Sequence, residues 1–220
     1  MGKLILVRHG NSVWNQKNIF TGWVDVSLSK KGIIEASDAG KILAKVKFDA
    51  IFTSTLSRAI MTLQLMMLEN EDLRTLIISH GEEKKFLHGV DMSTSIIAEC
   101  AEALNERYYG DMQGKNKDEV KEELGEQKFK EIRRSFLTPP PNGESLKMTI
   151  ERALPYFHEK ILPKVRRNET VLVVAHGNSL RGIVKEVKKI SDEDIAGVEI
   201  ATGSPLIFAF ENGCFKEGKI

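Results

Sequence analysis

The chain has 220 residues, of which 41% are hydrophobic, and its 32 basic and 31 acidic side chains leave a net charge of +1. This length suits one α/β domain over residues 1–220, and the balanced charge gives no support for a nucleic-acid or membrane partner. A signal-peptide pattern and a run of roughly 20 apolar residues are both absent from the sequence, so we expect a cytoplasmic protein. Cys100 and Cys214 have no paired spacing and suggest neither a disulfide framework nor a zinc site.

The first half of the chain is predicted to alternate buried strands with helices. Strands are expected over residues 3–8 and 48–53, where short apolar runs end in polar segments. The first helix is expected over 29–46 with Ser29 as its cap, and its apolar stripe consists of Ile33, Ala36, Leu43 and Val46. A second helix, over 56–69, is apolar nearly all round, which predicts deep burial.

Residues 70–95 fit this alternation poorly and are predicted to be an irregular insertion, with a short strand at 76–78 and loops at 81–85 and 88–95. The elements expected beyond it are helices over 116–136 and 147–165, a strand over 170–175, a helix over 179–189 and a hairpin over 206–215 with an Asn-Gly turn. This order of strands and helices predicts an α/β fold, a three-layer α/β/α sandwich with a mostly parallel central sheet.

Two of the predicted strands end in the same way. Residues 4–10 have the sequence Leu-Ile-Leu-Val-Arg-His-Gly, and residues 171–177 have the sequence Val-Leu-Val-Val-Ala-His-Gly. Ligands bind at the carboxyl edge of parallel strands, so neighbouring strands would bring His9 and His176 into one pocket with Arg8. Two imidazoles and a guanidinium favour chemistry on an anion, above all on a phosphoryl group.

The residues around His9 suit this chemistry. A neutral imidazole attacks phosphorus without first losing a proton near pH 7. Gly10 lets the backbone approach a ligand closely, and Ser12 and Asn15 add hydroxyl and amide donors. A metal site is the competing hypothesis, and it is disfavoured because arginines accompany the histidines while no carboxylate adjoins either of them in the sequence.

Further polar residues extend the candidate site. Arg58 lies in the first turn of a predicted helix, where the helix dipole disfavours a cation, and this hints at a nearby anion. Glu106 is a candidate general acid and base, whose pKa clustered phosphates would raise. Arg133 and Arg134, near the end of a charged helix, are ordinarily dipole partners but would suit a second anionic end of a ligand. Lys115 is a candidate partner for a phosphate or carboxylate.

These segments together resemble the histidine phosphatase superfamily, and within it the cofactor-dependent phosphoglycerate mutases. The resemblance covers residues 3 to about 210. The Arg-His-Gly sequence at residues 8–10 marks only the superfamily. The segments Thr-Gly-Trp at 21–23, Asn-Glu-Arg at 105–107 and Gly-Asn-Ser-Leu-Arg-Gly at 177–182 are more specific to the mutases. The resemblance implies a phosphoglycerate mutase-like sandwich.

The resemblance implies an isomerase that interconverts 2-phosphoglycerate and 3-phosphoglycerate, in glycolysis and gluconeogenesis, through a phosphohistidine at His9. It implies a 2,3-bisphosphoglycerate primer, no metal, and small phosphorylated three-carbon acids as partners, and it leaves open whether the chain forms a homo-oligomer. The implied catalytic residues are His9, Glu106, His176, Arg8 and Arg58. The implied substrate-binding residues are Arg8, Gly10, Asn11, Ser12, Asn15, Thr21, Gly22, Arg58, Glu106, Arg107, Tyr109, Lys115, Arg133, Arg134, Gly177 and Asn178.

Two alternatives stay open at this point. A phosphatase or bisphosphoglycerate phosphatase would use the same phosphohistidine and hand the group to water. A binding module that senses phosphorylated metabolites would do no chemistry. The sequence departs from the family at residue 11, which is Asn instead of Gln or Glu, and in the extra length of 70–95. It also stops at Ile220, where the family usually carries a longer tail over the site.

Overall fold

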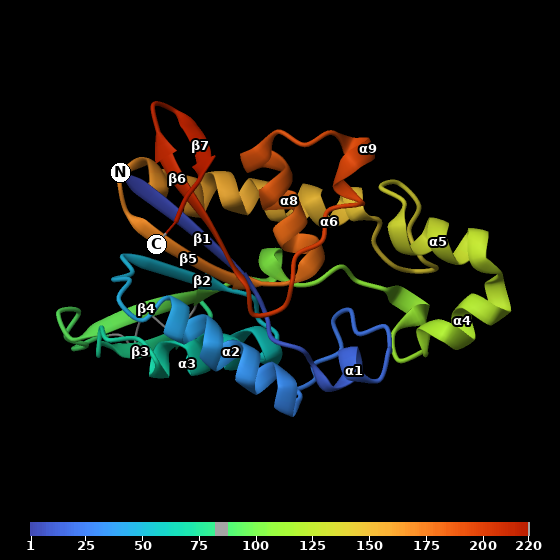
Figure 1. Ribbon diagram of the computed structural model, residues 1–220, viewed down its shortest axis with the longest axis horizontal. Helices are drawn as coiled ribbons and strands as arrows, with labels where there is room; N and C mark the ends of the chain where they lie inside the picture. Colours follow the sequence, from blue (N-terminus) through green and yellow to red (C-terminus); the bar gives the residue numbers. More distant parts are fainter. Residues whose placement is uncertain (82–87, 220) are drawn as a thin grey trace.

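The computed structural model describes residues 1–81 and 88–219, and its centre is a seven-stranded sheet in the order β3-β4-β2-β5-β1-β6-β7 (Figure 1). The strands are β1 (Gly2–Arg8), β2 (Ala50–Thr53), β3 (Thr75–Ser79), β4 (Ser95–Cys100), β5 (Thr170–Ala175), β6 (Pro205–Glu211) and β7 (Cys214–Glu217). The first five run parallel to one another, and β6 pairs antiparallel with β1 and with β7.

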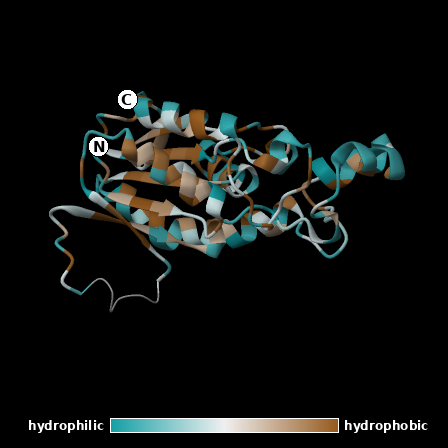
Figure 2. Ribbon diagram, turned by 90° about the horizontal axis from the view of Figure 1, so that it is seen from below, coloured by the Kyte–Doolittle hydropathy of each residue, from teal (hydrophilic) through white to brown (hydrophobic). Residues whose placement is uncertain are grey.

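Helices cover both faces of the sheet and give the predicted three-layer sandwich. One face carries α2 (Lys30–Ile42) and α3 (Ser57–Leu68), and the other carries α6 (Leu146–Tyr156), η4 (Phe157–Ile161), α7 (Leu162–Arg166) and α8 (Gly177–Lys188) (Figure 1). Figure 2 shows the hydrophobic strands between helices whose outer sides are largely hydrophilic. The predicted fold class is therefore confirmed.

The central strands are apolar along their whole length because both of their faces are covered. In β1, Leu4 and Leu6 pack into the core beneath α6 to α8, whereas Ile5 and Val7 pack into the core beneath α2 and α3. Successive side chains of a strand point to opposite faces, so a strand between two helical layers needs apolar residues at every position.

The predicted strands agree with the structure, but one strand is missing from the prediction. The strand expected at 76–78 is confirmed as β3, so residues 70–95 are not wholly irregular. Nothing was predicted at β4, whose apolar run is broken by Glu99; that carboxylate accepts a hydrogen bond from the Tyr156 hydroxyl at 2.6 Å. The loop expected at 81–85 lies largely outside the described residues, while the one at 88–95 extends to residue 94. The hairpin is confirmed, with Asn-Gly in the left-handed region at φ 51° and 79°.

Two helix predictions on one face of the sheet need correction. The helix predicted over 29–46 begins at its Ser29 cap but ends at Ile42, and Ile33 is 41% exposed. Its buried residues are the small Gly32, Ala36, Ala39 and Gly40. A Cβ at Gly40 would lie 2.7 Å from the Met66 carbonyl oxygen, so α2 approaches α3 closely there. The helix predicted over 56–69 buries only one side, and Leu68 is 81% exposed.

The charged helix predicted over 116–136 is two helices, α4 (Lys117–Leu124) and α5 (Glu126–Arg134). Gly125 interrupts it with φ at 78°, a conformation that glycine adopts readily. The two helices project at one end of the molecule, where they share a small core separate from the sheet (Figures 1 and 2). That core consists of Phe20, Met112, Val120, Phe129 and Ile132.

The helix predicted over 147–165 is continuous through α6 and α7 but widens into one π turn at η4. The helix predicted over 179–189 begins two residues earlier, at Gly177, directly after His176. The remaining short helices are α1 (Val13–Gln16), η2 (Glu102–Leu104), η3 (Gly110–Met112) and α9 (Asp192–Ile195). None of the helices in the described residues has the length and apolar character needed to cross a bilayer.

Candidate active site

The ends of four neighbouring parallel strands supply the candidate site. Arg8 and His9 lie at the end of β1, and His176 follows β5 and precedes α8. Arg58 lies in the first turn of α3 after β2, and Glu106 follows β4 and η2. Because β1, β5, β2 and β4 are adjacent, segments almost 170 residues apart meet at one edge of the sheet.

The two strand-end histidines are in ring contact, as their spacing along parallel strands predicts. The ring centroids of His9 and His176 are 4.9 Å apart, and both residues are buried. Burial, followed by the charge of Arg58, holds the pKa of each imidazole well below its ordinary value. Both rings are therefore neutral near pH 7.

One hydrogen bond determines which nitrogen of His9 is free. Its Nδ1 atom lies 2.7 Å from the carbonyl oxygen of Gly10. A carbonyl oxygen only accepts hydrogen bonds, so Nδ1 must carry the proton and Nε2 must carry the lone pair. The lone pair of Nε2 is therefore available to a ligand. The Nε2 atom of His176 lies 2.7 Å from the Ser54 hydroxyl.

Glu106 is a buried carboxylate whose two oxygens have different surroundings. Its Oε1 accepts hydrogen bonds from the backbone N–H of Arg107 at 2.7 Å and from the side-chain amide of Asn178 at 2.8 Å. Burial by itself raises the pKa of Glu106, but the Arg107 N–H, the charge of Arg8 and the Asn178 amide together lower it below its ordinary value. Glu106 is therefore ionised near pH 7. Its Oε2 atom faces Gly177, beside Arg8.

Two guanidinium groups stand beside the imidazoles. Arg58 is buried and donates to the carbonyl oxygens of Gly22 and Val24, and burial lowers its pKa only to about 10, so it stays charged. Arg8 donates from Nη1 to the Ile200 carbonyl, whereas its buried Nε–H has no partner among the described residues. An unsatisfied buried donor costs about 1–3 kcal/mol, which an anionic ligand would offset.

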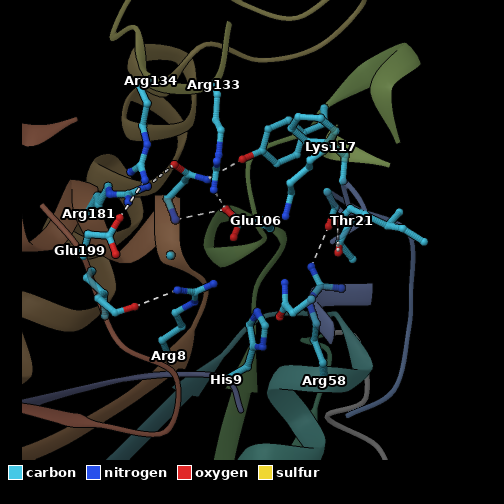
Figure 3. A pocket seen from close by; sticks show the side chains of 18 residues that line it. Arg8, His9, Thr21, Arg58, Glu106, Lys117, Arg133, Arg134, Arg181 and Glu199 are labelled. Carbon is cyan, nitrogen blue, oxygen red and sulfur yellow. Dashed lines mark hydrogen bonds and ion pairs between the residues drawn. The ribbon is translucent and has the colours of Figure 1, made fainter. Parts of the chain in front are cut away.

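The outer part of the cavity is lined by cations from α4, α5 and α8. Lys117 begins α4, Arg133 and Arg134 end α5, and Arg181 lies on the first turns of α8 (Figure 3). Burial, followed by the charges of Arg133 and Arg8, lowers the pKa of Lys117 to about 8. Six cationic side chains and two carboxylates, Glu106 and Glu199, line this cavity. The arrangement suits a small ligand with more than one anionic group.

A family model and full-length relatives place this chain among known proteins. The model described as histidine phosphatase superfamily (branch 1) matches residues 4–81 and 89–218. The chain belongs to the histidine phosphatase superfamily. It is 43% identical to a protein of Chlamydia pneumoniae, covering 96% of this chain and 95% of the relative, and 44% identical to one of Chlamydia abortus, covering 98% and 97%. Both relatives are named 2,3-bisphosphoglycerate-dependent phosphoglycerate mutase, so the family resemblance is confirmed.

Solved structures of other proteins share the fold. Bacillus stearothermophilus YhfR superposes with a TM-score of 0.77 at 26% identity, covering 99% of this chain and 95% of that one. A mycobacterial glucosyl-3-phosphoglycerate phosphatase superposes with a TM-score of 0.76 at 20% identity, covering 100% and 98%. At that identity the second likeness concerns the fold alone.

Most of the site residues that the histidine phosphatase resemblance implies lie around this cavity. The predicted residues that line it are Arg8, His9, Asn15, Thr21, Gly22, Arg58, Glu106, Tyr109, Arg133, Arg134, Gly177 and Asn178. His176 is fully buried directly behind His9. Their roles in a reaction remain proposals.

Five residues predicted to bind substrate do not line the cavity. Gly10 packs against α2, since a Cβ there would lie 2.3 Å from the Gly32 carbonyl oxygen. Ser12 caps α1, and Asn11 bonds through its side chain to the hydroxyl of Ser29. Gly10, Asn11 and Ser12 therefore fix the conformation of the loop after β1. Asn11 is the residue at which the sequence departs from the family.

Arg107 and Lys115 also lie elsewhere. The guanidinium of Arg107 is buried and donates to the carbonyls of Ile132 and Glu144, each at 2.7 Å, which anchors the end of α5. Lys115 lines a separate small hollow beside Met112, because its chain has already turned at Gly114.

The cavity also has lining residues that sequence reasoning missed. These are Ile19, Phe20, Lys117, Arg181, Glu199 and Ile200. Arg181 could have been found by helical spacing, since it lies one turn beyond Gly177 and Asn178. Glu199 and Ile200 belong to an irregular segment and carry no such signal.

The same cluster contains atoms that could bind a metal ion. His9, Glu106 and His176 each offer a ligand atom, and these atoms lie within 4.8 Å of one another, a proximity that sequence spacing did not reveal. Arg8 and Arg58, however, add two positive charges beside them. These surroundings favour an anion over a cation.

Proposed function

We propose that this chain is a 2,3-bisphosphoglycerate-dependent phosphoglycerate mutase, which interconverts 2-phosphoglycerate and 3-phosphoglycerate in glycolysis and gluconeogenesis. The observation that carries the proposal is the free Nε2 of His9, in ring contact with His176 and within the same small cluster as the Glu106 carboxylate. Relatives of that name at 42–44% identity over nearly the whole chain support it.

His9 is the residue that carries the phosphoryl group in this proposal. When Nε2 of His9 carries the phosphoryl group, the free hydroxyl of the phosphoglycerate attacks phosphorus, the bond from phosphorus to nitrogen breaks, and the Glu106 carboxylate accepts the hydroxyl proton. Nε2 of His9 then attacks the other phosphoryl group of the bisphosphorylated acid, the bond from that phosphorus to oxygen breaks, and the oxygen takes the proton back from Glu106. Since Oε1 already accepts three N–H groups, Oε2 is the oxygen that exchanges this proton.

The cations of the cavity stabilise the charge that moves during transfer. Arg8 and Arg58, with His176, surround the phosphoryl group at the inner end, where preorganised donors act in a dry site. Lys117, Arg133 and Arg134 face the second acidic group of the ligand at the outer end. The N-terminus of α8, at Gly177 and Asn178, adds backbone dipoles that favour an anion.

The cavity fits the bisphosphorylated primer that such a reaction needs. The unpartnered N–H of Arg8 and the cations at both ends match a small ligand with an anionic group at each end. When bound, the primer supplies the phosphoryl group that loads His9. In this proposal residues 1–220 form a single catalytic domain whose partners are small phosphorylated three-carbon acids.

Mass spectrometry after brief exposure of the protein to 2,3-bisphosphoglycerate tests the proposal. We expect one phosphate on His9, and a coupled assay should show 2-phosphoglycerate forming from 3-phosphoglycerate in the presence of primer. His9→Gln should lower this rate by about 10³-fold or more. His158→Gln, a change at an exposed histidine, is the matched control and should leave the rate unchanged.

The outcomes separate the competing functions. Release of inorganic phosphate faster than isomerisation would identify a phosphatase that uses the same histidine. Binding without turnover would identify a metabolite sensor. Turnover with an unmodified His9 would contradict the phosphohistidine mechanism altogether.

A further inference from the structure

Residues 198–200, which we call the strap, lie along one side of the cavity and are held by three arginines. Arg181 donates from Nε to the Val198 carbonyl at 2.7 Å, and Arg8 donates from Nη1 to the Ile200 carbonyl at 2.8 Å. Between them, Arg134 donates from Nη2 to the Glu199 carboxylate at 2.8 Å (Figure 3). The three arginines that donate hydrogen bonds to the strap therefore also line the cavity.

Glu199 differs from the rest of the strap because its side-chain carboxylate, and not a backbone carbonyl, accepts the hydrogen bond from an arginine. The backbone carbonyls that accept from Arg8 and Arg181 carry no formal charge. The Glu199 carboxylate instead neutralises Arg134, and the hydrogen bond from Arg134 in turn lowers the pKa of Glu199 below its ordinary value. Glu199 thus occupies, on Arg134, the place that an acidic group of a ligand would take.

Glu199 is also free to leave this position. Its side chain is 74% exposed, so it can rotate into solvent without movement of the strap backbone, which Arg8 and Arg181 hold on either side. A ligand that needs Arg134 must displace the carboxylate. A ligand that reaches only the inner end, at Arg8, His9 and Arg58, need not do so.

We propose that Glu199 is a specificity-determining residue that competes with the outer acidic group of the ligand for Arg134. It weakens binding of acids with two anionic ends while leaving the binding of inorganic phosphate at the inner end nearly unchanged. The competition eases release of the ligand that spans the cavity. This inference rests on the proposed function for the identity of that ligand.

Glu199→Gln tests the inference, since it removes the charge and keeps the shape. Isothermal titration calorimetry with 3-phosphoglycerate, 2,3-bisphosphoglycerate and inorganic phosphate measures the result without turnover. We expect the Kd of the two phosphoglycerates to fall about three- to fivefold, the scale of an exposed ion pair, and that of inorganic phosphate to change less than twofold. In the mutase assay, KM for 3-phosphoglycerate should fall without an increase in kcat.

Two further variants isolate the contact. In an Arg134→Gln background, Glu199→Gln should no longer change the Kd of 3-phosphoglycerate, because the contested arginine is gone. Glu186→Gln removes a carboxylate that pairs with Lys189 on the surface, away from the cavity, and should leave all three ligands unaffected.

Each other outcome overturns the inference. Weaker binding of the phosphoglycerates by Glu199→Gln would mean that Glu199 orients Arg134 for the ligand. An equal change in the Kd of inorganic phosphate would indicate that Glu199 acts on every anion through its charge alone. If Glu199→Gln left the Kd of the phosphoglycerates unchanged, competition for Arg134 would be excluded. Wild-type protein that binds 3-phosphoglycerate no better than inorganic phosphate would exclude it as well. A chain that binds these ligands but does not isomerise them would refute the proposed function while still testing Glu199.

Discussion

At the scale of single residues, burial and neighbouring charges decide the chemistry of side chains whose types are ordinary. His9 and His176 are neutral because their rings are buried among cations, and Glu106 is ionised because N–H groups and Arg8 outweigh its burial. Near pH 7 the site therefore holds two neutral imidazoles and an ionised carboxylate, which are the protonation states that the proposed mechanism needs.

We expect Lys117 to make ligand binding depend on pH. Below its pKa of about 8 the ammonium attracts an anionic ligand, and above it the neutral amine does not. We expect the Kd of 3-phosphoglycerate to rise by about three- to tenfold from pH 7 to pH 9, where the phosphate charge is nearly constant and Arg58 stays charged. Calorimetry across this range, at constant ionic strength, measures the change.

Two lysine variants show whether this pH dependence of the Kd arises from Lys117. Lys117→Arg keeps its charge throughout the range, so its Kd should stay flat above pH 7. Lys115→Arg, in the separate hollow beside Met112, should keep the wild-type slope. A wild-type Kd that does not change between pH 7 and pH 9 would contradict the role of Lys117.

At the scale of elements, the cavity depends on how α4 and α5 are attached to the sheet layers. Their small core around Phe20 and Phe129 is separate from the two main cores. The buried guanidinium of Arg107 ties the end of α5 to residue 144 through backbone carbonyls. A cation at a helix C-terminus also suits the helix dipole.

Arg107→Met should loosen this attachment. The lost donors leave buried carbonyls unsatisfied, so we expect the free energy of unfolding to fall by about 2–4 kcal/mol. Because α5 carries Arg133 and Arg134, KM for 3-phosphoglycerate should rise more than fivefold while kcat changes less. Urea unfolding and steady-state kinetics measure both effects.

The exposed residue Arg166 supplies the control for this variant. Arg166→Met removes the same charge from the surface near the end of α7 and should change stability by less than about 0.5 kcal/mol. If Arg107→Met lowered stability but left KM at the wild-type value, the end of α5 would not position the outer cations.

At the scale of the whole molecule, a nearly neutral chain gathers a local positive field. The net charge is only +1, yet the cavity is lined by six cations against two carboxylates. Like charges held close together in a partly dry cavity repel one another. An anionic ligand should therefore stabilise the folded chain as well as bind to it.

This stabilisation is measurable as a thermal shift. With 2,3-bisphosphoglycerate at about 100 times its Kd, linkage gives about 2.7 kcal/mol, or a rise in Tm of about 5–10 °C for a chain of this size. Sodium chloride at matched ionic strength should give a much smaller shift. A Tm that does not respond to the bisphosphate would contradict a ligand site in this cavity.

The sequence alone was enough for the sandwich fold and for the inner residues of the site. Uniform apolar runs such as residues 171–175 indicate strands covered on both faces, and a His-Gly step at the ends of two such strands indicates a shared edge. These signals are local or periodic, so they can be recognised in the sequence. The chemistry of histidine and arginine side chains is likewise known from the residue type alone.

Only the tertiary structure decided which side chains complete the cavity. Lys115 and Lys117 are two residues apart, yet a turn at Gly114 and the start of α4 put them in different hollows. Arg107 looks like a ligand residue in sequence but anchors α5, while Glu199 enters the site from an irregular strap. Contacts between distant segments, and the burial that sets protonation, arise from packing in three dimensions and leave no periodic trace in the chain.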